Sequence, residues 1–140
     1  EQKVGSINGR YSRLGWVPVV LFSQPMEFTE LMSWYMAADV CWITPLRDGL
    51  NLVVKEYVAA KQGRAGRLVL SEFTGAAVEL SDAILTHPYS ARSMDSAIDE
   101  ALAMTDAEAE AHMRNMLDSV RRHDLGAWTQ ALLDRFGIVR

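Results

Sequence analysis

The sequence predicts an open α/β fold in which a parallel β-sheet is covered by helices on both faces. Short apolar segments alternate along the chain with segments whose apolar residues recur at helical spacing, which is typical of right-handed βαβ crossovers. Two strand candidates, VCWI at residues 40–43 and LVL at residues 68–70, are apolar throughout, as strands buried on both faces are. The 140 residues, of which 49% are hydrophobic, have the length and composition of one globular domain.

The first two thirds of the chain supply the strand candidates and the helices between them. Residues 17–22 (VPVVLF) form a β-branched run, and Pro18 lies near its start, where a strand tolerates proline. Residues 26–39 carry apolar side chains at helical spacing and predict a helix. Further strands are predicted at Val40–Ile43, Arg67–Ser71 and residues 83–86, and a further helix at residues 50–61.

The last third of the chain is predicted to be helical. Residues 93–104 have an apolar side, and Thr105 with Glu108 forms a capping box that starts a second helix. Asp124 can cap a final helix, so residues 93–136 are predicted to close the domain with helices. Doubly wound sheets usually have about five or six strands. Four strand candidates therefore indicate that further strands of the sheet precede the first candidate.

The charge balance and the apolar pattern argue against two classes of partner. The 18 acidic and 14 basic residues give a formal net charge of −4, whereas binding to nucleic acid through bulk charge needs a positive surface. No stretch approaches the roughly 20 apolar residues needed to cross a bilayer, and no signal peptide opens the chain. We therefore expect a cytoplasmic protein with no nucleic-acid or membrane partner. The single Cys41 lies in an apolar run and is expected to be a reduced core residue.

Motifs for several common chemistries are missing from the sequence. It has no Gly-x-Ser-x-Gly elbow, no phosphate loop ending in Gly-Lys-Ser/Thr, and no Gly-x-Gly-x-x-Gly. His87, His112 and His123 lack the spacing of a metal site, and structural or surface roles are expected for all three. We therefore predict no metal and no cofactor, and we do not expect Cys41 to be a nucleophile.

The segment TPLRDGLN at residues 44–51 joins a predicted strand to a predicted helix. Ligands of open parallel sheets lie outside the carboxyl ends of the strands, where this segment is placed. Free N–H groups at residues 50–53 and the helix dipole would together bind a phosphate or another anion. Gly49 lets the backbone approach a ligand closely and allows a positive φ angle. Asp48 offers acceptors to sugar hydroxyls, and the Glu56 carboxylate, one turn further along, is suited to a ribose diol.

A purely structural interpretation of the same residues stays open. Asp-Gly is a common turn, and an Asp or Asn before a helix is a common cap. Lys55 and Glu56 would by default be solvated surface charges. A second glycine-containing segment, SEFTGAAVEL at residues 71–80, follows the next predicted strand and would by itself be a plain loop. Because both segments are expected at the same edge of the sheet, each strengthens the ligand-binding interpretation of the other.

Two stretches of the chain resemble the trehalose-6-phosphate synthase family. They are ITPLRDGLNLVVKEYVAAK at residues 43–61 and LVLSEFTGAAVEL at residues 68–80, and the motif Asp-Gly-x-Asn-Leu-Val-x-Lys-Glu is far longer than chance allows. The family comprises retaining glycosyltransferases of the GT-B fold, in which two Rossmann-like domains face each other across a cleft. The resemblance spans nearly the whole chain. It implies that residues 1–140 are a truncated C-terminal, donor-binding domain with a Rossmann-like open parallel sheet.

One branch of that family, the glucosylglycerol-phosphate synthases, is the most similar. The resemblance lies in the Trp of DVCWITPLRDGLNLV and in the stretches INGRYSRLGWVPVVLF, AVELSDAILTHPY and RSMDSAIDEALAM. This branch transfers glucose from ADP-glucose to glycerol 3-phosphate, on the way to the compatible solute glucosylglycerol. The alternative is the trehalose branch, which uses glucose 6-phosphate as acceptor and often UDP-glucose as donor. A non-catalytic nucleotide-sugar-binding or regulatory module is an alternative of another class.

The resemblance also implies a mechanism and a set of site residues. The reaction would be a front-face displacement through an oxocarbenium-like transition state, in which the leaving diphosphate accepts the acceptor's proton and no side chain acts as nucleophile. The family's Arg and Lys that grip the diphosphate, and most of its acceptor pocket, lie outside these 140 residues, so the chain alone is expected to be inactive. Asp48, the catalytic candidate, would bind glucose hydroxyls; the amides of Gly49, Leu50 and Asn51 would hold the sugar, those of Leu52 and Val53 the diphosphate, and Glu56 the ribose diol.

Overall fold

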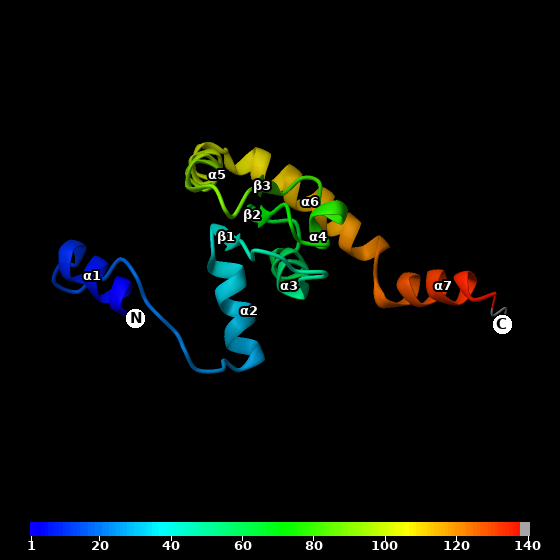
Figure 1. Ribbon diagram of the computed structural model, residues 1–140, viewed down its shortest axis with the longest axis horizontal. Coiled ribbons are helices and arrows are strands. Elements are labelled where there is room, and N and C mark those ends of the chain that lie inside the picture. Colours follow the sequence, from blue (N-terminus) through cyan, green and yellow to red (C-terminus); the bar gives the residue numbers. More distant parts are fainter. Residues whose placement is uncertain (138–140) are drawn as a thin grey trace.

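The computed structural model describes residues 1–137, which form a three-stranded parallel sheet flanked by helices (Figure 1). Strands β1 (Val40–Ile43), β2 (Arg67–Ser71) and β3 (Ile84–Thr86) lie in that order, and β2 pairs with both neighbours. Within one residue, these strands coincide with three of the four predicted strands. The parallel α/β fold is therefore confirmed.

Helices precede, connect and follow the strands. Those predicted from apolar spacing are present, with boundaries shifted by a few residues, whereas α1 and the single-turn α4 were not indicated by the spacing. None of the helices within residues 1–137 is both long enough and apolar enough to span a membrane. The helices of this part of the chain are α1 (Gln2–Tyr11), α2 (Phe28–Ala37), α3 (Leu52–Lys61), α4 (Ala76–Glu79), α5 (Ala91–Ala103), α6 (Asp106–Arg122) and α7 (Leu125–Arg135).

Helices cover both faces of the sheet. Side chains alternate along β2, so Leu68 and Leu70 lie on one face and Val69 on the other. Leu68 and Leu70 pack with buried side chains of α3 and α6, whereas Val69 packs with Ala97 and Ala101 of α5. The almost continuous apolar character of the strands follows from this arrangement, because neither face of the central strand meets water.

Side-chain caps stabilise the first turns of the last three helices. The Thr105 side chain accepts a hydrogen bond from the Glu108 N–H (3.3 Å), and the Glu108 carboxylate accepts one from the Thr105 N–H (2.9 Å), which confirms the predicted capping box. Asp124 caps α7, also as predicted, by accepting from the N–H three residues further on (2.8 Å). Helix α5 begins two residues earlier than predicted because Ser90 caps it in the same way.

The predicted strand at residues 17–22 is wrong. These residues belong to an extended loop between α1 and α2, which Figure 1 shows lying apart from the sheet. A strand is stable only when a neighbouring strand takes up its backbone hydrogen bonds, and among residues 1–137 no strand pairs with this segment. The side-chain amide of Asn8 instead bonds the N–H and the carbonyl oxygen of Val19, at 3.0 and 2.8 Å.

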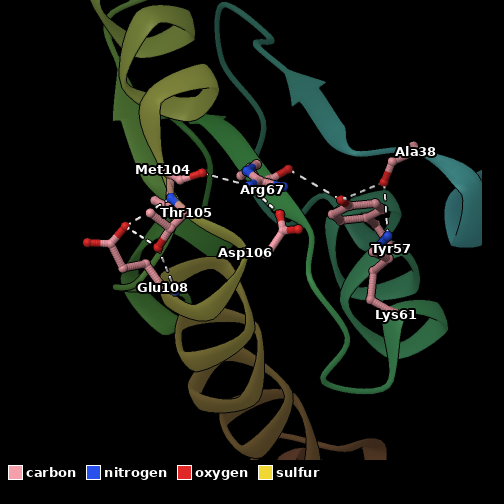
Figure 2. Close-up of polar contacts among 8 residues, drawn as sticks. All are labelled: Ala38, Tyr57, Lys61, Arg67, Met104, Thr105, Asp106 and Glu108. Carbon is pink, nitrogen blue, oxygen red and sulfur yellow. Dashed lines mark hydrogen bonds and ion pairs between the residues drawn. The ribbon is translucent and has the colours of Figure 1, made fainter.

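A buried lysine joins the end of α3 to the end of α2. Lys61 is only 5% exposed, and its ammonium group donates hydrogen bonds to the carbonyl oxygens of Met36 (3.1 Å) and Ala38 (3.0 Å). The last carbonyl oxygens of a helix lack intrahelical partners and favour a nearby cation. Burial lowers the pKa of Lys61 from its ordinary value. Figure 2 shows the Lys61 ammonium and the Tyr57 hydroxyl meeting at the Ala38 carbonyl oxygen.

The guanidinium group of Arg67 joins the start of β2 to the turn between α5 and α6. It donates hydrogen bonds to the carbonyl oxygen of Met104 (2.6 Å) and to the carboxylate of Asp106 (2.8 Å), which precede and begin α6 (Figure 2). The end of α5 and the start of α6 are thereby fixed against the sheet. Asp106 is largely exposed, and an ion pair that is exposed to water contributes little. The position of the turn therefore depends chiefly on the hydrogen bond from Arg67 to the carbonyl oxygen of Met104.

Replacing Thr105→Ala is expected to lower the free energy of unfolding by about 1 kcal/mol, because the Glu108 N–H at the start of α6 would lose its side-chain acceptor. Urea denaturation followed by circular dichroism measures this change. Ser96→Ala, on the exposed side of α5, is the matched control and should not lower the midpoint. A Thr105→Ala midpoint equal to that of the wild type would contradict a stabilising role for the capping box.

Candidate functional site

The loops that follow β1 and β2 are paired with each other beyond the ends of the strands. The Asp48 N–H donates to the carbonyl oxygen of Phe73 (3.1 Å), and the Gly75 N–H donates to the carbonyl oxygen of Asp48 (2.9 Å). This is a parallel bridge between Asp48 and Thr74, which continues the pairing of β1 with β2. The expectation that the two glycine-containing loops lie together at one edge of the sheet is confirmed.

Close backbone contact explains the glycine at position 75. A Cβ atom there would lie 2.0 Å from the carbonyl oxygen of Gly49 and 2.8 Å from its carbonyl carbon. Both neighbours are backbone atoms, so no side-chain rotation relieves the clash, and only glycine fits. At Gly49, by contrast, a Cβ atom would meet nothing within 4 Å, so this backbone segment is open on its outer side.

The left-handed residue of the first loop is Asn51, where φ is 58° and ψ is 84°. Gly49, which would allow a positive φ angle, does not adopt one, because Asn51 makes the turn into α3 instead. Asparagine tolerates this conformation since its side chain forms local hydrogen bonds. Here Asn51 Oδ1 accepts from the Val54 N–H (3.1 Å) and caps the helix, which begins at Leu52 rather than at residue 50.

The carboxylate of Asp48 is held by the loop that it belongs to. Its Oδ1 accepts hydrogen bonds from the Leu50 N–H (3.0 Å) and the Asn51 N–H (3.2 Å), and its Oδ2 accepts from Asn51 Nδ2 (3.0 Å). The bond from Leu50, followed by those from Asn51, lowers the pKa of Asp48 from its ordinary value and keeps the group ionised. Oδ1 already accepts two hydrogen bonds, so Oδ2, which accepts one, is the oxygen that can accept a further hydrogen bond from a ligand.

Fewer backbone N–H groups are free in the loop after β1 and at the start of α3 than predicted. The N–H groups of Leu50 and Asn51 are taken by Asp48, so the expectation that they are free is wrong. Within residues 1–137 the N–H groups of Gly49, Leu52 and Val53 make no hydrogen bond. Leu52 and Val53 are the first two residues of α3, where the helix dipole adds to the attraction for an anion.

Glu56 and Lys55 point to different sides of α3. Glu56 follows Leu52 by four residues, so the two share one side of the helix, and its Oε2 accepts a hydrogen bond from the Tyr35 hydroxyl (3.3 Å). Lys55 lies 2.6 Å from the carboxylate of Glu79 in α4, and the two side chains are 15% and 30% exposed. The default expectation of a solvated charge is therefore wrong for Lys55, because the packing of α4 against α3 brings Glu79 to it.

The remaining candidate groups are not organised as a catalytic centre. Ring nitrogens of His112 and His123 lie 3.1 and 2.9 Å from backbone carbonyl oxygens, and His87 lies 3.7 Å from the Glu72 carboxylate, in keeping with structural or surface roles. Cys41 packs against the core, and burial raises its pKa to about 11, so it stays a thiol. Among residues 1–137 no three His, Cys, Asp or Glu side chains lie together in a way that could hold a metal ion.

This edge of the sheet therefore combines donors and acceptors in a fixed order. The Asp48 carboxylate lies before the start of α3, the free amides of Leu52 and Val53 lie at its first turn, and the Glu56 carboxylate lies one turn further on. Amides at a helix start bind phosphate, whereas carboxylates accept hydrogen bonds from hydroxyl groups. The order suits an elongated ligand that has an anionic middle and hydroxyl groups on both sides.

Comparison with known proteins assigns the chain to a family. Residues 1–137 match glycosyltransferase family 20. The chain belongs to this family. The match covers the strands, the paired loops and all of α3, so the donor and acceptor groups described above lie within the matched region.

Two curated relatives illustrate the similarity to family 20 enzymes. The chain is 53% identical over 133 residues to the glucosylglycerol-phosphate synthase of Synechocystis sp. strain PCC 6803, which covers 95% of the chain and 27% of that protein. It is 44% identical over 134 residues to the trehalose-6-phosphate synthase of Mycobacterium ulcerans, which covers 96% of the chain and 27% of that protein. The chain thus spans about a quarter of the length of these relatives.

A solved structure of a family relative supports the same fold. The chain matches an E. coli structure bound with UDP-2-fluoro glucose, with a TM-score of 0.90 and 39% identity, over 99% of the chain and 31% of that structure. The fold is that of the C-terminal part of a GT-B glycosyltransferase, as the resemblance implied.

Asn51→Ala is expected to raise the pKa of Asp48 towards its ordinary value, because the hydrogen bond from the Asn51 side chain is lost. The folded-state pKa lies below the unfolded-state value of about 3.9. The stability that the ionised group contributes is thus fully present above that value and is lost as the pH falls through the folded-state pKa. An acid titration that follows the Asp48 carboxyl carbon by NMR measures the pKa of Asp48 in the wild type and in Asn51→Ala.

Asn115→Ala is the matched control for that titration. Its side-chain amide donates to Asp82 (2.9 Å), not to the loop after β1, and its loss should leave the pKa of Asp48 unchanged. An Asp48 pKa that is the same in Asn51→Ala and in the wild type would show that the side-chain bond does not hold the carboxylate.

Proposed function

We propose that this chain is the donor-binding part of a retaining glycosyltransferase that transfers glucose from a nucleoside diphosphate glucose to a phosphorylated acceptor. The observation that carries the proposal is the pair of unbonded amides of Leu52 and Val53, which lies between the carboxylates of Asp48 and Glu56. Membership of glycosyltransferase family 20 supports the reaction class. The free amides support the placement of the diphosphate at the start of α3.

Each group of the site has a part in this proposal. Asp48 accepts hydrogen bonds from hydroxyls of the transferred glucose, and the free Gly49 amide donates to the same sugar. The amides of Leu52 and Val53 hold the diphosphate, and Glu56 accepts from the ribose diol. We assign Leu50 and Asn51 to the site through Asp48, because their amides donate to its carboxylate and fix its direction.

The start of α3 would act on the transition state as well as on binding. Negative charge grows on the leaving diphosphate as its bond to glucose breaks, and fixed amides at a helix start stabilise that charge without reorganising. The leaving diphosphate would then take the proton of the acceptor hydroxyl, as the family's front-face displacement requires. In that mechanism no protein nucleophile is needed. Asp48 contributes by fixing the glucose ring, so that the acceptor approaches the correct carbon.

We further propose ADP-glucose as donor and glycerol 3-phosphate as acceptor, with glucosylglycerol phosphate as product. The support is the higher identity to the glucosylglycerol-phosphate synthase, 53%, than to the trehalose-6-phosphate synthase, 44%. The second candidate is trehalose-6-phosphate synthesis, with glucose 6-phosphate as acceptor. The E. coli relative bound with UDP-2-fluoro glucose supports a uridine donor for that candidate.

The chain supplies only part of the active site in this proposal. It spans 27% of the curated relatives, and the acceptor pocket and the basic residues that grip the diphosphate would come from the rest of a longer protein. We call that longer protein the complete enzyme. The 140-residue chain by itself should therefore transfer no glucose.

A donor and acceptor screen on the complete enzyme tests the proposed substrates. ADP-glucose and UDP-glucose are each supplied with glycerol 3-phosphate or glucose 6-phosphate, and products are identified by mass spectrometry. Glucosylglycerol phosphate from ADP-glucose and glycerol 3-phosphate is the expected result. Product from glucose 6-phosphate only would favour the trehalose branch and overturn the proposed acceptor.

Asp48→Ala should lower kcat/KM of the complete enzyme by roughly a hundredfold or more, because a group that fixes the reacting sugar is lost. Asp95→Ala, on the exposed side of α5, is the matched control and should leave kcat/KM unchanged. Initial rates over a range of donor concentrations give both values. If the protein is a non-catalytic nucleotide-sugar-binding or regulatory module, no rate will depend on Asp48.

A further inference from the structure

We propose that Tyr35 is a positioning residue that aims the carboxylate of Glu56 at the ribose of the donor. The inference rests on the proposed function, in which Glu56 receives the ribose diol, and it adds a residue from a different helix. Tyr35 lies on α2, 21 positions before Glu56, and its hydroxyl donates a hydrogen bond to Glu56 Oε2 (3.3 Å). The donor site therefore depends on how α2 packs against α3.

The hydrogen bond restricts a side chain that would otherwise sample many rotamers. A glutamate loses rotamer entropy when it is ordered. If Tyr35 already orders Glu56 before the ligand binds, the loss of that entropy no longer weakens binding. The bond engages Oε2, which leaves Oε1 and the second acceptor direction of Oε2 for a ligand.

The ring of Tyr35 is itself held by the core. It lies edge-on to the ring of Tyr57, with centroids 6.2 Å apart and planes at 83°. Tyr57 is fully buried, and its hydroxyl lies 3.4 Å from the carbonyl oxygens of both Ala38 and Arg67. Because the sheet and α2 fix Tyr57, they also fix the direction from which Tyr35 reaches Glu56.

The hydroxyl of Tyr35 remains a donor under physiological conditions. Burial, followed by the negative charge of Glu56, raises the pKa of Tyr35 above its ordinary value. A protonated phenol beside a carboxylate can only donate to it, so the sense of the bond is fixed. Lys55, the neighbouring residue on α3, does not compete for Glu56, because its ammonium group is paired with Glu79 on the other side.

A purely structural role for Tyr35 makes a different prediction from a positioning role. A residue that only joins α2 to α3 would affect all nucleotides equally when it is altered. A residue that aims Glu56 would affect only ligands that carry the ribose hydroxyl that Glu56 binds. The ratio of the inhibition constants of 2′-deoxy-ADP and ADP separates the two roles, because the ligands differ by one hydroxyl.

The experiment measures competitive inhibition of the complete enzyme by ADP and by 2′-deoxy-ADP, or by the uridine pair if the donor screen selects uridine. The wild type should prefer the ribose form by roughly tenfold, as expected for a hydroxyl bonded to a carboxylate. In Tyr35→Phe the ratio should fall to roughly two- to threefold with kcat nearly unchanged. Tyr11→Phe, on the exposed helix α1, is the matched control and should keep the wild-type ratio.

Glu56→Gln separates failure of this inference from failure of the proposed function. If Glu56→Gln lowers the ratio and Tyr35→Phe does not, Glu56 binds ribose without help from Tyr35, and only the inference is overturned. Equal weakening of both inhibitors in Tyr35→Phe, with an unchanged ratio, also overturns it. If the wild type does not distinguish the two inhibitors, the ribose contact of the proposed function fails, and the inference fails with it.

Discussion

The backbone pairing of the loops after β1 and β2 is the constraint on which the candidate site depends. Asp48 exchanges hydrogen bonds with the backbone of Phe73 and Gly75, so the first loop has a fixed place beside the second. The pairing requires a glycine at 75, because the carbonyl group of Gly49 occupies the space of a Cβ atom. The loop fixed in this way sets both the direction of the Asp48 carboxylate and the residue at which α3 begins.

Charge at this edge selects against a simple anion. The free amides at the start of α3 attract phosphate, but the carboxylates of Asp48 and Glu56 lie before and beyond them and repel negative charge. A free phosphate would gain little from such a site. The donor that we propose, a nucleoside diphosphate sugar, has its charge in the middle and hydroxyl groups on both sides, so it would meet donors where it is negative and acceptors where it carries hydroxyls.

Much of the fold and part of the site are predictable from the sequence because the forces are local. The central strand Arg67–Ser71 shows its buried environment through the apolar run of residues 68–70, and Thr105 with Glu108 encodes the start of a helix within four residues. The motif after β1 likewise predicts Asp48 and Glu56 at a helix start. Residues 17–22 mark the limit of this reasoning, because strand-forming residues form no strand without a partner.

The sequence by itself determined the three strands of the sheet and most of its helices, the caps that start α6 and α7, and the loops that meet at the carboxyl edge of the sheet. Only the tertiary structure decided which hydroxyl bonds the Glu56 carboxylate, since Tyr35 reaches it from another helix, and which charge pairs with Lys55, since Glu79 belongs to α4. The physical reason is distance along the chain. Hydrogen bonds within one turn follow from neighbouring residues, whereas contacts between α2 and α3 exist only after the core has packed.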